Sequence, residues 1–184
     1  RGFTARTSGQ LPYDVVFLLN RFFDAIVPCI TQAGGDIAKY LGDGLLAVFE
    51  AKDAQRSAQA GLMAASTIGQ ALQAFNETLL SEGEQPVQIG MGLHLGELVI
   101  GEIGAAGNAP RTIIGDSVNT ASRLEGASKD QEVELIVSAS VLQAAGYQHL
   151  DLDMQTLSLR GVAEPLSALP VRRASDLPQL LGSL

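Results

Sequence analysis

A lysine and an aspartate accompany a tight turn in the stretch GGDIAKYLGDGLLAVF, residues 34–49. Lys39 falls in the first of two apolar runs, and Asp43 lies between the two glycines that separate these runs. Glycine and aspartate favour a hairpin turn, so Asp43 is expected at its tip. A carboxylate at an open turn offers oxygen ligands to a hard cation such as Mg²⁺ that carries a phosphate. Both residues are therefore candidates for ligand binding.

A second candidate pair lies in the segment RTIIGDSVNTASRLEG, residues 111–126. Asn119 and Arg123 are four residues apart in a predicted helix, so both side chains point to the same side. The opening residues RGFT, with Gly2 ahead of the first predicted helix, offer free backbone N–H groups to an anion. Together these features indicate a site for a nucleotide and a metal ion.

Each feature also has an interpretation without a ligand. A turn aspartate is usually a solvent-exposed residue, and a strand lysine often extends only into solvent. Arg123 could pair with a nearby carboxylate such as Glu125 or Glu102. His94 alternates with apolar neighbours and has no second histidine or cysteine at ligand spacing, so we interpret it as a strand or interface residue.

Two amphipathic helices and several short strands are expected to position these candidates. Apolar residues recur at helical spacing over residues 13–33 and again over residues 53–80. Between these helices, residues 37–41 and 45–49 are predicted as the two strands of the hairpin. Residues 88–104 are rich in β-formers and glycine, which predicts one long strand or a bent hairpin.

The second half of the chain continues the alternation of strands and helices. After an exposed loop at residues 105–110, a short strand at 112–114 turns at Gly115 into a helix with Asp116 as its N-cap. A strand at 133–137 and a short helix at 138–145 are predicted next. Further short strands follow up to residue 172, and residues 173–184 form a C-terminal tail. This order predicts an α+β fold with a ferredoxin-like split βαβ core whose first strand is truncated.

The composition favours a single globular domain over residues 1–184. Hydrophobic residues make up 46% of the chain and charged residues 17%, which suits a full core. No apolar run approaches the ~20 residues that a membrane helix requires. The net charge of −8 argues against a nucleic-acid groove, because phosphate backbones are bound by clustered lysine and arginine. The lone cysteine, Cys29, is interpreted as a core residue.

Three ordered motifs resemble those of class III nucleotidyl cyclase catalytic domains, over most of the chain. The stretch AKYLGDG resembles the family motif in which a lysine precedes Gly-Asp by a short strand. GMGLHLGELVIGEIG resembles the glycine-punctuated central strand and arm, and TIIGDSVNTASRLE resembles the Gly-x-x-Val-Asn-x-Ala-x-Arg helix. RGFT resembles the end of the family's phosphate loop. The resemblance implies the class III cyclase fold.

The resemblance also implies roles in metal and base binding. Asp43 is similar to the second metal carboxylate of the family, which binds Mg²⁺ or Mn²⁺ with two ions expected in each site. The first metal carboxylate of the family lies two residues before RGFT, so it is expected upstream of Arg1, and the N-terminus is expected to be incomplete. Lys39 and Thr112 are similar to the two residues that select adenine.

Further roles concern the ribose and the phosphates. Asn119 is similar to the residue that orients the ribose, and Arg123 to the residue that stabilises charge at the α-phosphate. Arg160, in LRGVAEP, resembles a basic contact to the terminal phosphates. The backbone amides that bind phosphate are expected from three residues: Gly2, Phe3 and Thr4.

The implied activity is that of an adenylate cyclase, which converts ATP to 3′,5′-cyclic AMP and pyrophosphate. The resemblance implies a head-to-tail homodimer in which Asp43 of one subunit meets Lys39, Thr112, Asn119 and Arg123 of the other. It also implies an upstream regulatory domain in the full-length protein and a cytoplasmic catalytic domain, with membrane attachment of the parent protein left open.

Two alternatives remain at this point. A cyclase-like domain could serve as a nucleotide-sensing or dimerisation module without turnover, which the absent first carboxylate favours and the intact Lys39, Asn119 and Arg123 disfavour. A guanylate cyclase is the other alternative. A glutamate at position 39 would support it, because a carboxylate accepts hydrogen bonds from the guanine edge, whereas lysine disfavours it.

Overall fold

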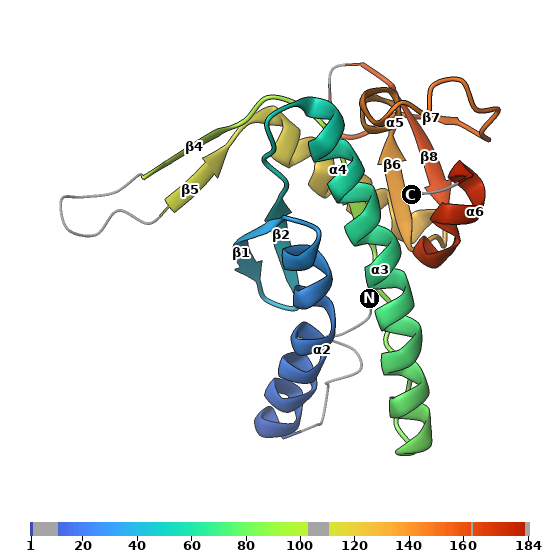
Figure 1. Ribbon diagram of the computed structural model, residues 1–184. Coiled ribbons are helices and arrows are strands. Elements are labelled where there is room, and N and C mark those ends of the chain that lie inside the picture. Colours follow the sequence, from blue (N-terminus) through green and yellow to red (C-terminus); the bar gives the residue numbers. More distant parts are fainter. Residues whose placement is uncertain (2–10, 103–110, 163, 183–184) are drawn as a thin grey trace.

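Two long helices stand beside a set of short strands, and a two-stranded arm extends away from them (Figure 1). The computed structural model describes Arg1 and residues 11–102, 111–162 and 164–182. The loop expected at 105–110 lies outside these described residues. None of the described helices combines the length and the apolar character that a membrane span requires.

Helices α2 (Pro12–Gln32) and α3 (Ala54–Ser81) confirm both predicted long helices to within one residue at each end. Helix α3 begins after Asp53, whose Oδ1 accepts a hydrogen bond from the backbone N–H of Arg56 at 2.8 Å. The two helices pack side by side, and Cys29 is buried in their interface as expected. The other buried members of this cluster are Phe22, Ile26, Ile30, Ile68, Leu72, Phe75 and Leu79.

Strands β1 (Asp36–Leu41) and β2 (Gly44–Val48) form the predicted antiparallel hairpin. Their pairing leaves only Gly42 and Asp43 in the turn. Gly42 has a φ of +68°, a left-handed conformation that glycine adopts without strain. The turn therefore places the aspartate at the hairpin tip, as the sequence predicts.

A four-stranded sheet forms the second half of the molecule. Its strands, in spatial order, are β3 (Met91–Leu93), β6 (Leu135–Ser138), β8 (Leu166–Val171) and β7 (Gln155–Leu157). Strand β3 runs parallel to β6, and the other neighbours are antiparallel. Within the described residues no strand joins this sheet to the β1–β2 hairpin. The expected α+β class with a split βαβ core is confirmed.

Within the expected segment 88–104, the described residues 88–102 form neither one long strand nor a hairpin, so both expectations are wrong for them. Strand β3 is followed by five residues outside any strand, and β4 (Val99–Glu102) then lies in a different sheet. There β4 pairs with β5 (Arg111–Ile114) to form the arm seen in Figure 1. The chain bends between the two strands because β6 pairs with one of them and β5 with the other.

Helix α4 (Asp116–Asp130) has Gly115 as its N-cap, so the expected capping role of Asp116 is wrong. A Cβ on Gly115 would lie 2.8 Å from the carbonyl oxygen of Glu97, which leaves no room for a side chain at the cap. Asp116 instead occupies the first turn of the helix. Its carboxylate suits the positive end of the helix dipole there.

The C-terminal residues belong to the core, although the sequence suggests a tail. A 3₁₀ turn (Ala174–Asp176) leads into helix α6 (Leu177–Leu181), and both pack against α3. Ala174 and Leu177 are completely buried. They join the apolar cluster that also includes helix α5 (Ala139–Ala145). This segment therefore stabilises the same face of α3 that supports the sheet.

Helix α4 lies unusually close to strand β3. A Cβ added to Gly92 would lie 2.2 Å from the carbonyl oxygen of Ala121 and 2.5 Å from the backbone nitrogen of Glu125. Only a residue without a side chain can occupy this position of the strand. The glycines of the GMGLHLG segment thus set how closely α4, with its candidate residues, approaches the sheet.

We expect Gly92→Ala to destabilise the protein by about 1–3 kcal/mol, because backbone atoms of α4 must move to admit the methyl group. Gly126→Ala is the matched control. Gly126 lies in α4, and nothing lies within 4 Å of a Cβ added there. It should stabilise the protein by roughly 0.5–1 kcal/mol, because alanine favours a helix interior. Urea denaturation of both variants measures the two effects, and equal stability of the two would contradict the close-approach argument.

Candidate functional site

The β1–β2 hairpin positions Lys39 and Asp43. Lys39 pairs with Leu46, so their side chains share one face of the hairpin. The next residue, Tyr40, points to the opposite face, where its ring contacts Phe23 of α2 at a centroid distance of 5.0 Å. Helix α2 therefore covers the Tyr40 face and leaves the Lys39 face open. Both Lys39 and Asp43 are exposed.

Helix α4 positions Asn119 and Arg123. Its buried stripe consists of Thr120, Leu124 and Ser128, which recur every four residues and anchor the helix on the sheet. Asn119 and Arg123 precede two of these buried residues by one position each, so they form the neighbouring stripe and are both exposed. The expectation that the two side chains lie one turn apart on the same side agrees with this helix.

The arm carries Thr112. This residue pairs with Gly101 and is half-buried. By strand alternation it shares its face of the arm with Val99 and Ile114, two large apolar side chains that are 69% and 53% exposed. Arg160 lies in an exposed turn after β7. In the sequence it is far from the hairpin, the arm and α4.

The structure thus places the described candidates on the hairpin, the arm, α4 and the turn at residue 160, and the hairpin strand β1 contacts the arm strand β5. Gly2, Phe3 and Thr4 lie outside the described residues. Among the residues that the structure describes, no three histidine, cysteine, aspartate or glutamate side chains group as a metal site. The exposed carboxylate of Asp43 fits the oxygen-ligand chemistry of a hard cation, but it provides only one protein ligand.

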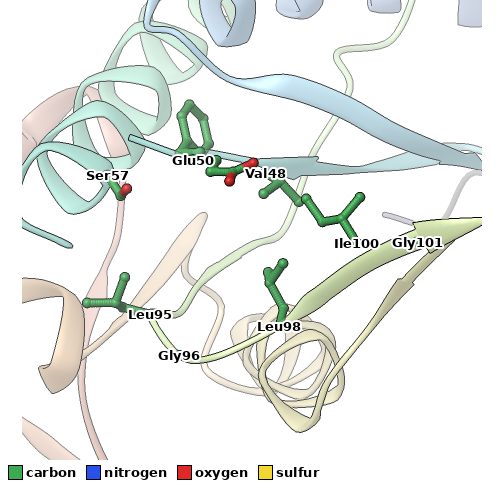
Figure 2. Close-up of a pocket in the computed structure, with 9 residues that line it drawn as sticks. Val48, Glu50, Ser57, Leu95, Gly96, Leu98, Ile100 and Gly101 are labelled. Carbon is green, nitrogen blue, oxygen red and sulfur yellow. The ribbon is translucent and has the colours of Figure 1, made fainter. Parts of the chain in front are cut away.

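An open cleft of about 670 Å³ lies between the end of β2, the start of α3 and the start of β4 (Figure 2). Figure 2 shows side chains from β2 and β4 on opposite sides of this space. Glu50 is its one charged lining residue, accompanied by Val48, Phe49, Ser57, Leu95, Gly96, Leu98, Ile100 and Gly101. Val48 lies two residues after Leu46, so the cleft continues the open face that carries Lys39.

Sequence reasoning did not identify the cleft residues. The available signal was the position of Glu50, a carboxylate that directly follows the apolar run of the second hairpin strand. Ser57 gave no signal, because its hydroxyl accepts a hydrogen bond from the backbone of Ala51 at 3.0 Å, a contact that depends on how the chain enters α3. The cleft is therefore a product of tertiary arrangement.

His94 directly follows β3, where it connects two parts of the fold. Its Nδ1 lies 3.0 Å from Ser138 Oγ, which in turn lies 2.9 Å from Ser140 Oγ. The Ser140 hydroxyl donates to the carbonyl oxygen of Leu95, a cleft residue, at 3.1 Å. Burial lowers the pKa of His94 below its ordinary value of 6.5. This hydrogen-bonded imidazole lies one position beyond β3, so His94 is not a residue of the strand itself, which was one of its two expected places.

Residues 1–164 match the family model described as "Adenylate and Guanylate cyclase catalytic domain". The chain is 30% identical over 179 residues to an adenylate cyclase of Anabaena cylindrica, which covers 94% of this chain and 35% of that protein. It is 33% identical over 141 residues to adenylate cyclase 1 of Rhizobium meliloti, which covers 76% of this chain and 21% of that protein. This chain therefore spans about a third or less of these two relatives.

Two solved structures share the fold. The crystal structure of the guanylyl cyclase Cya2 superposes with a TM-score of 0.81 at 30% identity, over 93% of this chain and 86% of that chain. The adenylyl cyclase CyaB from P. aeruginosa superposes with a TM-score of 0.78 at 24% identity, over 91% of this chain and 87% of that chain. The fold expected from the motifs is confirmed by both.

The stability of the protein is expected to fall as the pH decreases below 6.5. Because the pKa of His94 is lowered by burial, the unfolded chain binds a proton in a pH range where the folded protein does not. The stabilisation is complete above the ordinary pKa and is lost as the pH falls toward the lowered one. Urea denaturation at pH 7.5 and pH 5.5 should show a smaller loss for His94→Gln than for the wild type.

His149→Gln is the control for this prediction, since His149 is exposed. It should keep the pH dependence of the wild type. An equally steep loss of stability in His94→Gln and wild type would show that other groups carry the pH dependence.

Proposed function

The chain belongs to the family of adenylate and guanylate cyclase catalytic domains, and we propose that it converts ATP to 3′,5′-cyclic AMP and pyrophosphate. The observation that carries the choice of adenine is Lys39, an exposed lysine on the open face of the hairpin at the position that resembles the purine contact. An ammonium group only donates hydrogen bonds, and adenine N1 is an acceptor. Guanine presents an N–H donor at the same ring position, which lysine cannot satisfy.

The proposed reaction is an in-line attack of the ribose 3′-hydroxyl on the α-phosphate. Arg123 would offset the charge that develops on the α-phosphate oxygens, because its guanidinium carries a fixed fork of donors. Asn119, one turn earlier, would orient the ribose. Arg160 and the backbone amides of Gly2, Phe3 and Thr4 would bind the remaining phosphates.

Asp43 would supply a carboxylate ligand to divalent metal, Mg²⁺ or Mn²⁺, with two ions expected in the complete site. Bound metal activates the attacking hydroxyl and neutralises the leaving pyrophosphate. The single carboxylate at the hairpin tip supports a site that needs further ligands from outside the described residues.

A head-to-tail homodimer would complete the site. Large apolar side chains lie beside the candidates on the open faces: Leu41 is 54% exposed and lies two residues from Lys39, and the paired Val99 and Ile114 lie next to Thr112 on the same face of the arm. Apolar surface of this kind favours burial against another protein surface. A second copy of the chain would bury it and would bring the Asp43 of one subunit to the Asn119 and Arg123 of its partner.

The full-length protein is proposed to carry a regulatory domain beside this cytoplasmic catalytic domain. The basis is that the chain spans only 35% and 21% of two adenylate cyclases that it resembles.

A guanylate cyclase is the second candidate function. The observation in its favour is the likeness to Cya2, which is named as a guanylyl cyclase and is 30% identical to this chain.

Replacement of the two proposed adenine contacts tests the base specificity. Lys39→Glu with Thr112→Cys supplies a carboxylate that accepts from the guanine N–H groups and a thiol that donates to its O6. The ratio of kcat/KM for ATP to that for GTP should fall on the order of 10²-fold, because mismatched buried polar groups penalise the wrong base. Lys52→Glu, at an exposed lysine outside the site, should leave the ratio unchanged. An unaltered ratio in an active double variant would remove both residues from base recognition.

Complementation between two inactive variants tests the shared site. In the full-length protein, Asp43→Ala and Arg123→Ala should each lower kcat by roughly 10²-fold or more, because the first removes a proposed metal ligand and the second removes a cation that offsets transition-state charge. Mixing the two variants should restore activity, since one of the two sites in the mixed dimer then holds an intact Asp43 and an intact Arg123. Recovery should increase with protein concentration.

Asp151 is an exposed carboxylate outside the site, so Asp151→Ala should behave as the wild type. Mixing each inactive variant with Asp151→Ala is the control for subunit exchange. Native mass spectrometry confirms that mixed dimers form. A mixture that exchanges subunits and stays inactive would place the whole site within one chain and would refute the proposed dimer.

A further inference from the structure

The side chain of Arg1 enters a niche at the C-terminal end of α4. Its Nη2 donates to Ser128 Oγ at 2.6 Å and also to the carbonyl oxygen of Val133. Ser128 is completely buried, although it is a polar residue on the apolar stripe of the helix. Hydrogen bonds from a charged donor are the strong ones, so this contact holds the helix end firmly.

Ser128 is a junction in this part of the fold. Its hydroxyl donates to the carbonyl oxygen of Glu125 at 2.5 Å, and its own carbonyl oxygen accepts from the backbone N–H of Val133 at 3.0 Å. The two acceptors of the Arg1 guanidinium therefore lie on either side of the point where α4 ends and the chain turns toward β6. A cation also suits this end of the helix, where the dipole is negative.

The niche is bounded on its other side by the segment that leads into β3. The backbone nitrogen of Arg1 donates to the carbonyl oxygen of Gln88. A Cβ on Gly90 would lie 2.5 Å from Ser128 Oγ and 3.1 Å from Arg1 Nη2, so the glycine leaves just enough space for the guanidinium. Arg1 thus links the lead-in to β3 with the end of α4.

We propose that Arg1 is a positioning residue that sets the placement of α4 on the sheet and, through it, the placement of Arg123 and Asn119. The proposal rests on the proposed function, because these two residues are its reaction residues. Arg123 lies five residues before Ser128, about 7.5 Å along the helix axis at 1.5 Å per residue. A displacement of about 1 Å at a group that acts on the transition state can cost on the order of 10²-fold in rate.

The first test replaces Arg1 in the full-length protein. Arg1→Met keeps most of the side-chain length and removes the donors, so kcat should fall about 10- to 100-fold, while KM for ATP changes by no more than about twofold. Arg1→Lys keeps a charged donor for Ser128 or Val133 and should recover part of kcat. Ser128→Ala should lower kcat in the same direction, and the double variant should be less than additive because the two residues share one contact.

Arg56→Met is the matched control, because Arg56 is an exposed arginine whose ion pair with Asp53 is long, at 3.7 Å. It should leave kcat unchanged. A loss of melting temperature in Arg1→Met with unchanged kcat would show that Arg1 only stabilises the fold, and the proposal would be wrong.

The complementing pair locates the effect within the mixed dimer. Arg1→Met added to the Asp43→Ala chain, which supplies Arg123 to the restored site, should lower the restored activity about 10- to 100-fold, as in the homodimer. Added to the Arg123→Ala chain, which supplies Asp43, it should have a much smaller effect. The assignment to α4 would be overturned if Arg1→Met lowered the restored activity equally on both chains, or more strongly on the Arg123→Ala chain.

Hydrogen exchange provides a readout that does not depend on activity. In Arg1→Met the amides of the last two turns of α4 should exchange faster than in wild type, while those in the middle of α3 remain unchanged. Unchanged exchange in α4 would refute the proposal even if turnover fell. If the wild-type full-length protein forms no cyclic nucleotide, the proposed function itself fails, while faster exchange in α4 of Arg1→Met would still show the anchor.

Discussion

The close approach of α4 to β3 is the constraint on which the rest of the structure depends. Gly92 lies against the helix backbone so closely that a Cβ would be 2.2 Å from a carbonyl oxygen of α4. Gly96, three residues after β3, lies against a side chain at the start of the helix, since an added Cβ would be 2.3 Å from the hydroxyl oxygen of Ser117. With the helix backbone in direct contact with the strand, the stripe next to its buried residues must face outward. That stripe carries Asn119 and Arg123.

The remaining candidate elements diverge from the same core. The hairpin rests on α2 through Tyr40 and Phe23, and this contact turns Lys39 to the opposite, open face. Among the strands that the structure describes, β4 pairs with β5 alone, and the arm therefore leaves the sheet. Three supports of different origin therefore hold the candidate polar residues, which are exposed on the hairpin and on α4 and half-buried on the arm. This arrangement suits a site that a second copy completes.

Local patterns in the sequence were sufficient for much of the fold. The helices at α2 and α3 and the hairpin turn at Asp43 follow from apolar spacing and turn chemistry, which act within a few residues. The division of residues 88–104 into two strands did not follow, because it depends on which distant strands pair with each part. The burial of Leu177 is likewise set by contact with α3. For the site, helical spacing placed Asn119 beside Arg123, but the cleft at Glu50 requires the tertiary arrangement.

Exposure of the candidates in one chain also has an energetic basis. Charged side chains such as Lys39, Asp43 and Arg123 lose hydration when they are buried, and that loss is offset only when opposite charges meet them. Within one chain these residues stay solvated, so folding does not bear the cost of burying them. The apolar neighbours Leu41, Val99 and Ile114 are between 53% and 69% exposed, so covering each can contribute roughly 1–2 kcal/mol, which favours association. In the proposed site, desolvation of Asp43 and Arg123 would coincide with the arrival of the metal and phosphates proposed to pair with them.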